Sequence, residues 1–150
     1  MITWEQLRVG REQHAFVCGK TGSGKSKLAE FLVNDPYKAY SVVWDPKHSR
    51  TISEWKNQTF IYDFQALKNA VEAKRIVYRP PTELFDDEDE QDRFFKWVYQ
   101  QGHVRLYVDE LSSLLGGSRP NFWLKLCLML GRERGISVVT TIQRPVSMPL

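Results

Sequence analysis

The chain has 150 residues, of which 42% are hydrophobic and 26% charged, a composition typical of one globular domain and not of a disordered or fibrous chain. No apolar run approaches the length of a membrane-spanning helix, and the first residues lack the basic and apolar segments of a secretion signal, so we expect a cytoplasmic protein without a membrane segment. The net charge of +3 is too small to identify a polyanion as the partner.

A glycine-rich segment follows the first expected strand, residues 14–18. It reads GKTGSGKS and matches the phosphate-binding loop G-x-x-x-x-G-K-S (Walker A) in its strand-loop-helix context. Glycine at positive φ turns backbone N–H groups toward a phosphate, the lysine adds a charge, and the serine hydroxyl can bind Mg²⁺. We therefore expect a bound triphosphate, where the alternative is a plain glycine-rich turn. The expected nucleotide-binding residues are Gly19, Lys20, Thr21, Gly22, Ser23, Gly24, Lys25, Ser26 and Lys27.

The remaining elements alternate along the chain. Apolar, β-branched runs predict strands at 40–44, 75–78, 106–108 and 136–142, and helices are expected near 25–33, 65–73, 87–101 and 121–130. This alternation predicts a single α/β domain over residues 1–150, with a largely parallel sheet covered on both faces. The stretch 47–60 is the least periodic and is expected to be a long loop. We expect Cys18 and Cys127 to be reduced core residues, with no disulfide and no zinc site.

An acidic run occupies residues 86–92. Carboxylates bind hard cations, so a metal site is one interpretation. The other is a solvated helix start, because negative charge in a first turn interacts favourably with the helix dipole and apolar residues follow just downstream. We favour the helix start.

The segment 105–110 reads RLYVDE, an apolar strand that ends in two carboxylates. This matches the second signature of P-loop triphosphatases (Walker B), in which the first acid reaches the Mg²⁺ shell and the next acts on the attacking water. We therefore assign Asp109, together with Ser26, to the metal and Glu110 to the water as general base.

The segment 131–145 reads GRERGISVVTTIQRP. If its strand lies between the phosphate-loop strand and the Asp109 strand, Gln143 emerges between Lys25 and Glu110, where its amide can sense the γ-phosphate; otherwise it only caps a strand. Arg132 and Arg134 precede that strand, away from the phosphate loop of the same subunit. One of them could enter a neighbour's site as an arginine finger, or both could be solvated at a helix end.

Taken together, the phosphate loop, the Asp45-Pro46-Lys47 segment, LYVDE and the Gln-Arg-Pro turn resemble the FtsK/HerA superfamily of DNA-pumping ATPases, especially its viral genome-packaging branch. The resemblance implies a three-layer RecA-like fold with an additional strand, ATP and Mg²⁺ as cofactors, and hydrolysis at subunit interfaces. It also implies a hexameric homo-oligomeric ring around double-stranded DNA, a capsid or portal-type partner, and a location in the host cytoplasm or virion. Weak candidates for DNA contacts are Lys47, Arg50, Lys56 and Arg119.

Two points qualify the resemblance. Members of the superfamily usually continue past the Gln-Arg-Pro turn with a helix and a closing strand, whereas this sequence ends at Leu150, so we expect either a fragment or a partner that covers the edge. A nucleotide-gated assembly component that binds ATP without turnover, and a small-molecule kinase using the same loop, remain as alternative functions.

Overall fold

The strands form one parallel sheet in the computed structural model, which describes residues 9–10, 12–34, 40–70, 72–115 and 120–142. Within these residues the sheet has six strands in the order β1-β6-β5-β2-β4-β3, and every neighbouring pair is parallel. The predicted α/β class is therefore confirmed. The strands are β1 (Ala15–Cys18), β2 (Ser41–Trp44), β3 (Thr59–Ile61), β4 (Arg75–Tyr78), β5 (Arg105–Val108) and β6 (Ser137–Ile142).

The strand β6 lies between β1 and β5, although it comes last along the described chain. Val139 is in register with Ala15 on one side and with Tyr107 on the other. This is the additional-strand arrangement that the family resemblance implied. Because all six strands run in one direction, the segments that follow β1, β2 and β5 lie at the same edge of the sheet as the end of β6.

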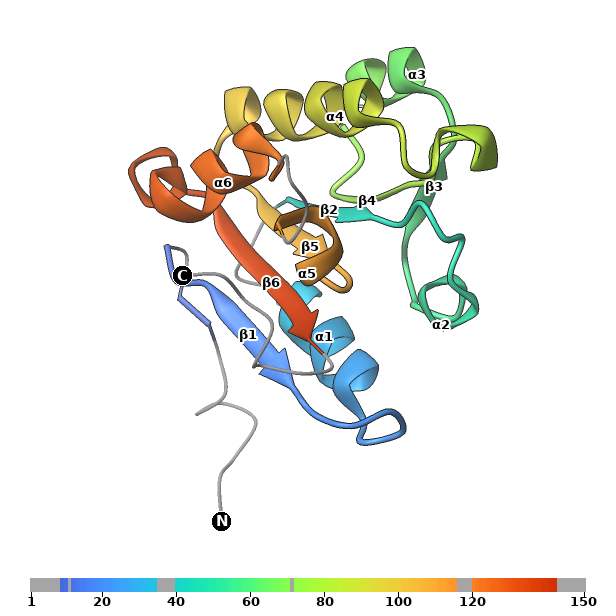
Figure 1. The fold of residues 1–150 in the computed structure, drawn as a ribbon, viewed down its shortest axis with the longest axis vertical. Helices are drawn as coiled ribbons and strands as arrows, with labels where there is room; N and C mark the ends of the chain where they lie inside the picture. The colour runs from blue at the N-terminus through green and yellow to red at the C-terminus, as the bar shows by residue number, and fades with distance from the viewer. Residues whose placement is uncertain (1–8, 11, 35–39, 71, 116–119, 143–150) are drawn as a thin grey trace.

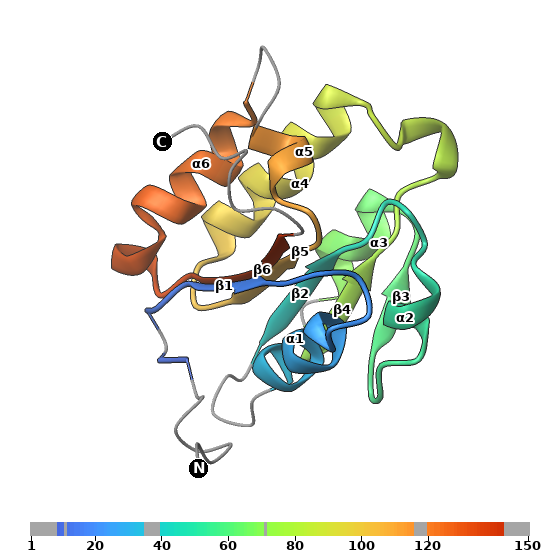
Figure 2. The ribbon, with the colours of Figure 1, turned by 60° about the horizontal axis from the view of Figure 1, so that its bottom comes forward.

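Helices cover both faces, as Figures 1 and 2 show. One apolar cluster joins α1 and the α2 segment to one face, and a larger cluster joins α3, α4 and α6 to the other. This gives the three layers expected of the fold. The helices are α1 (Lys25–Val33), α2 (Arg50–Ser53), α3 (Phe64–Asn69), α4 (Glu88–Gln101), α5 (Ser112–Leu115) and α6 (Phe122–Met129), with 3₁₀ turns η2 (Thr82–Leu84) and η3 (Gly131–Arg134).

Two expectations from the sequence are wrong. The stretch 47–60 is not a plain loop, because it contains α2 and enters β3 at Thr59; both elements are too short to give a periodic pattern. Cys18 is exposed, whereas Cys127 is buried as expected. Side chains alternate along a strand, so Val17 packs toward α1 while its neighbour Cys18 points away from that core.

The acidic run begins α4, as the sequence favoured. Asp87 caps the helix by accepting a hydrogen bond from the Glu90 N–H group at 2.7 Å. Glu90 itself is buried and accepts hydrogen bonds from the Tyr78 hydroxyl and from Arg93. Burial raises the pKa of Tyr78 to about 12. This run is therefore a structural link between α4 and β4.

No helix in the described part of the chain combines the length and apolarity needed to cross a membrane.

Candidate functional site

The phosphate loop follows β1 at the carboxyl edge of the sheet. Gly22 and Gly24 have φ values of 80° and 85°, a backbone conformation that side-chain-bearing residues rarely adopt. A Cβ on Gly19 would lie 2.6 Å from the Ser23 hydroxyl oxygen, so the Ser23 side chain would have to move to accommodate it. Gly22 and Gly24 are therefore required by the path of the loop.

The helix α1 begins directly at the loop. Gly24 is its N-cap and provides no side-chain cap, so the N–H groups of the first turn face the loop. The Lys25 ammonium group donates hydrogen bonds to the Gly19 and Lys20 carbonyl oxygens at 2.7 and 2.8 Å. The lysine charge and the positive end of the helix dipole consequently act on the same space inside the phosphate loop, which suits an anion.

The Asp109 carboxylate lies beside the phosphate loop, in the same cleft. The four residues of β5 before it are buried, whereas Asp109 is exposed. Its Oδ1 accepts a hydrogen bond from the Thr141 hydroxyl on β6, and the Tyr107 hydroxyl lies 3.4 Å from the same oxygen. The neighbouring strand thus fixes one oxygen of the carboxylate, and burial of Tyr107 raises the pKa of its phenol.

Glu110 has a φ value of 54°, in the left-handed region that is uncommon for a residue other than glycine. The Ser112 hydroxyl donates a hydrogen bond to its Oε1 at 2.6 Å, and the Ser113 hydroxyl donates to its carbonyl oxygen at 2.9 Å. Such backbone strain concentrates at functional sites, where surrounding contacts maintain it. Here these two hydrogen bonds hold the strained residue.

Together these residues form an open cleft of about 430 Å³, within the size range of ligand sites. Residues from the loop, β5 and β6 converge on it, as the sequence predicted for Lys25, Ser26, Asp109 and Glu110. The cleft is lined by Thr21, Gly22, Gly24, Lys25, Ser26, Lys27, Thr51, Asp109, Glu110 and Thr141.

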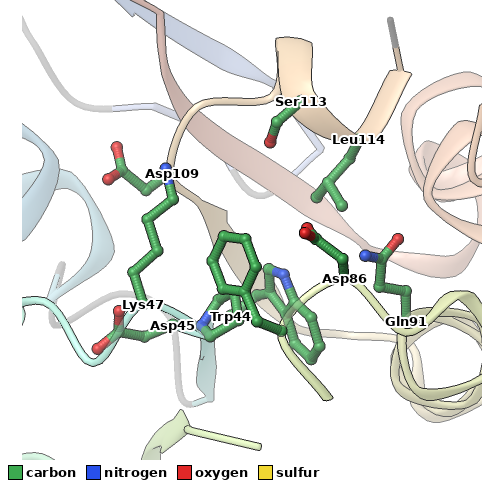
Figure 3. A pocket seen from close by; sticks show the side chains of 10 residues that line it. Trp44, Asp45, Lys47, Asp86, Gln91, Asp109, Ser113 and Leu114 are labelled. Atoms are coloured by element: carbon green, nitrogen blue, oxygen red, sulfur yellow. The ribbon is translucent and has the colours of Figure 1, made fainter. Parts of the chain in front are cut away.

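A smaller pocket of about 100 Å³ adjoins the cleft and shares Asp109 with it. Figure 3 shows this pocket between the turn that follows β2 and the segment that follows β5. Asp45 and Lys47 line it, and Asp45 forms a buried ion pair with Arg79 at 2.8 Å. Burial raises the pKa of Asp45, while the hydrogen bonds from the Ser49 N–H group and Arg79 oppose this shift.

The two candidate arginine fingers lie at the other edge of the sheet, just before β6 begins. The Arg134 guanidinium donates hydrogen bonds to the Tyr99 and Gln100 carbonyl oxygens at 2.7 and 3.1 Å, and it stacks on the Tyr99 ring. It therefore caps the end of α4. Arg132 is exposed.

The remaining predicted site residues either lie outside the described residues or are exposed and do not line the cleft. Gln143 and Arg119 lie outside the described residues, although β6 ends at Ile142, directly before Gln143. Arg50 and Lys56 are exposed on the segment between β2 and β3, where Arg50 pairs with Glu54 at 3.5 Å.

Sequence reasoning missed Thr51, Tyr107 and Thr141. Thr51 lies on a helix of four residues, which gave no periodic signal. Tyr107 lies two residues before Asp109, whereas Thr141 reaches Asp109 only because β5 and β6 are neighbours in register. An estimate of that register from the expected strand order would have indicated Thr141.

A scan against protein-family models finds no match, and a search of curated protein sequences finds no significant match. Solved structures do match. The genome packaging NTPase B204 from Sulfolobus turreted icosahedral virus 2, in complex with AMPPCP, has a TM-score of 0.70 at 17% identity, and the match covers 93% of this chain and 68% of that one.

Two further matches are weaker. The cytoplasmic domain of EssC has a TM-score of 0.53 at 17% identity, covering 92% of this chain and 28% of that one. The pCW3 conjugation coupling protein TcpA, with ATPγS, has a TM-score of 0.51 at 16% identity, covering 91% and 45%. At this identity the likeness shows the fold. It confirms the fold that the resemblance implied.

Proposed function

We propose that this chain is a Mg²⁺-dependent ATPase that moves double-stranded DNA, as a genome-packaging or DNA-pumping motor does. One observation carries the proposal: β6 lies between β1 and β5, so that the phosphate loop, Asp109 and Glu110 line one cleft. The fold is shared with B204, described as a genome packaging NTPase and solved with AMPPCP and with ATPγS.

The residues of the cleft suit a magnesium triphosphate. No group of three or more His, Cys, Asp or Glu side chains in the described residues could hold a metal by itself, so we assign Mg²⁺ to Ser26, Asp109 and the phosphates together. Bound Mg²⁺ would neutralise charge that develops on the phosphates. Lys25 and the first turn of α1 bind and orient the phosphates, and Glu110 accepts a proton from the attacking water. Gln143 is proposed to position that water at the γ-phosphate.

The motor function requires a ring. We propose a hexameric homo-oligomer in which an arginine from one subunit completes its neighbour's site. Arg132 is the better candidate, since the Arg134 guanidinium already caps α4. Lys47, Arg50, Lys56 and Arg119 are the proposed DNA contacts from the sequence, and a capsid or portal-type protein is the proposed further partner, in the host cytoplasm or the virion.

One observation favours a second function, a nucleotide-gated assembly component that binds ATP without appreciable turnover. The Ser112 hydroxyl occupies one oxygen of the Glu110 carboxylate, the group assigned to the attacking water. A site that keeps this hydrogen bond after binding ATP would bind the nucleotide but hydrolyse it slowly.

The test is the steady-state rate of ATP hydrolysis with increasing double-stranded DNA, with particle size measured in the same buffer. The motor predicts DNA-stimulated turnover that is lost in Lys25→Ala and in Glu110→Gln. The control is Lys68→Ala, which removes an exposed lysine on α3, outside the cleft, and should leave the rate unchanged. Nucleotide-dependent assembly without turnover would favour the second function.

A further inference from the structure

The turn that follows β2, residues 45–49, is held firmly by buried interactions. The Asp45 carboxylate, 2% exposed, accepts hydrogen bonds from the Ser49 N–H group at 2.9 Å and from Arg79 Nε at 2.8 Å. The His48 N–H group donates to the Asp45 carbonyl oxygen at 3.2 Å, which closes the turn. Arg79 also donates to Ser49 and Ser53, so the turn, β4 and α2 form one connected unit.

The same turn carries backbone strain. His48 has a φ value of 49°, which is unfavourable for a residue with a side chain. Its Nε2 lies 2.9 Å from the Pro80 carbonyl oxygen, and its ring packs edge-on against Tyr62. A strained conformation persists only where its surroundings determine it, and such positions cluster at ligand sites. A solvated loop would need none of these contacts.

This turn presents Lys47 to the nucleotide site. Lys47 is exposed, and it lines the small pocket together with Asp109, which in turn lines the cleft with Lys25 and Ser26. Figure 3 shows the Lys47 side chain extending from the turn toward Asp109. Lys47 takes part in none of the ion pairs formed within the described part of the chain. A cation is thus presented beside the expected metal ligand.

We propose that Lys47 is a second phosphate-binding lysine, whose ammonium group contacts the terminal phosphate of the bound triphosphate beside Asp109. The proposal rests on the proposed ATP-binding function and replaces the DNA contact suggested for this residue. A triphosphate keeps negative charge after it binds Mg²⁺, and phosphoryl transfer is accelerated mainly by positioned positive charge. Lys25 supplies one cation from the loop, and Lys47 supplies a second from the turn after β2.

The test measures equilibrium binding rather than turnover. Isothermal titration calorimetry with Mg²⁺ compares AMPPCP with ADP for the wild type, Lys47→Ala, Lys47→Arg and the matched control Lys68→Ala, an exposed lysine on α3 that lines neither the cleft nor the small pocket. We expect Lys47→Ala to weaken AMPPCP binding roughly tenfold, the usual effect of one hydrogen bond to a charged group, and to leave ADP binding nearly unchanged. Lys47→Arg should keep most of the affinity, and Lys68→Ala all of it.

Four results would overturn the proposal. Lys47→Ala could weaken AMPPCP and ADP equally, or weaken neither, in which case Lys47 does not contact the terminal phosphate. It could instead lower the affinity for a double-stranded DNA duplex measured without nucleotide while AMPPCP binding is unchanged, and Lys47 would then be a DNA contact. A wild-type chain that binds neither nucleotide refutes the ATPase proposal itself and the Lys47 proposal with it. The thermal unfolding midpoint of each variant confirms that the exposed substitution leaves the fold intact.

Discussion

At the scale of single residues, the position of the Asp109 carboxylate depends on a side chain from another strand. The Thr141 hydroxyl on β6 donates a hydrogen bond to Asp109 Oδ1. The Tyr107 hydroxyl lies 3.4 Å from Asp109 Oδ1 and 3.4 Å from the Thr141 hydroxyl oxygen. A residue that orients a metal ligand in this way usually changes metal affinity when it is replaced. Thr141 therefore acts as a positioning residue for the proposed Mg²⁺ site.

We predict that Thr141→Val raises the Mg²⁺ concentration for half-maximal ATP hydrolysis by roughly 10- to 100-fold, the typical cost of losing such a supporting hydrogen bond. Valine keeps the shape of threonine but cannot donate to Asp109. Thr141→Ser keeps the hydroxyl and should restore most of the Mg²⁺ affinity. An unchanged Mg²⁺ dependence in the valine variant would show that Asp109 needs no such partner.

The buried ion pair between Asp45 and Arg79 yields a prediction for stability. The side chains are 2% and 8% exposed, so Asp45→Ala leaves a buried guanidinium without its carboxylate. We expect the free energy of unfolding in urea to fall by about 3–5 kcal/mol. The double variant Asp45→Ala with Arg79→Met should lose less than the sum of the two single variants. Strictly additive losses would contradict a direct interaction.

Some residues of the site could be predicted from the sequence and others could not. The motifs place Lys25, Ser26, Asp109 and Glu110 at one cleft because the phosphate loop follows β1 and the two acids follow β5, at the same edge of the sheet. The contact of Thr141 could not be predicted in this way, because its partner Asp109 lies 32 positions away and meets it only through strand register. The roles of these residues, and those of Gln143 and the two arginines, remain predictions.

At the scale of elements, the amino-terminal ends of β1 and β6 are joined by a histidine. His14 Nδ1 accepts a hydrogen bond from the Val138 N–H group at 2.9 Å, so this nitrogen must be unprotonated. Burial lowers the pKa of His14, a backbone hydrogen bond opposes the shift, and the nearby charge of Arg132 lowers it further. Protonation of His14 therefore works against the pairing of these two strands.

This arrangement predicts a pH-dependent stability. A histidine whose pKa is lower in the folded state contributes stability that is complete above its unfolded value of about 6.5 and is lost as the pH falls below it. We expect the free energy of unfolding to decrease from pH 7.5 to pH 5.5. In His14→Asn, whose amide oxygen can accept the same hydrogen bond without titrating, this decrease should be smaller. An equal decrease in both proteins would contradict the assignment.

The longer elements follow from the sequence, and the short ones do not. The helix α1 and the strand β4 have the bounds that periodicity predicts, and α4 begins after its acidic cap. The strand β3 has three residues and α2 has four. Segments this short do not contain enough residues to show the apolar periodicity of a strand or a helix. Their positions are set by packing, through Ile52, Ile61 and Trp55.

At the scale of the whole molecule, the sheet order decides which groups can meet in one subunit. The phosphate loop and Asp109 lie at the carboxyl edge, whereas Arg132 precedes β6 at the opposite edge. A subunit can therefore supply the phosphate loop to one site and an arginine only to another. The three-layer architecture was predictable from the alternation of strands and helices, but ring formation was not, because it depends on surfaces between copies.

This geometry predicts complementation between two inactive variants. Glu110→Gln disables the site of its own subunit but keeps Arg132, and Arg132→Ala does the reverse. Mixed rings contain some interfaces with an intact site and an intact arginine, so mixing the two proteins should restore part of the DNA-stimulated ATPase rate. A mixture as inactive as either protein alone, at a concentration where wild-type rings form, would argue against a shared site.

The most direct test of the central claim is an experimental structure of the chain with AMPPCP and Mg²⁺. We predict that the β- and γ-phosphates lie against Gly22, Gly24 and the first turn of α1. We also expect the metal to lie between Ser26 and Asp109, with Glu110 and Gln143 facing the γ-phosphate. A nucleotide bound elsewhere, or Glu110 and Gln143 turned away from its terminal phosphate, would contradict the account.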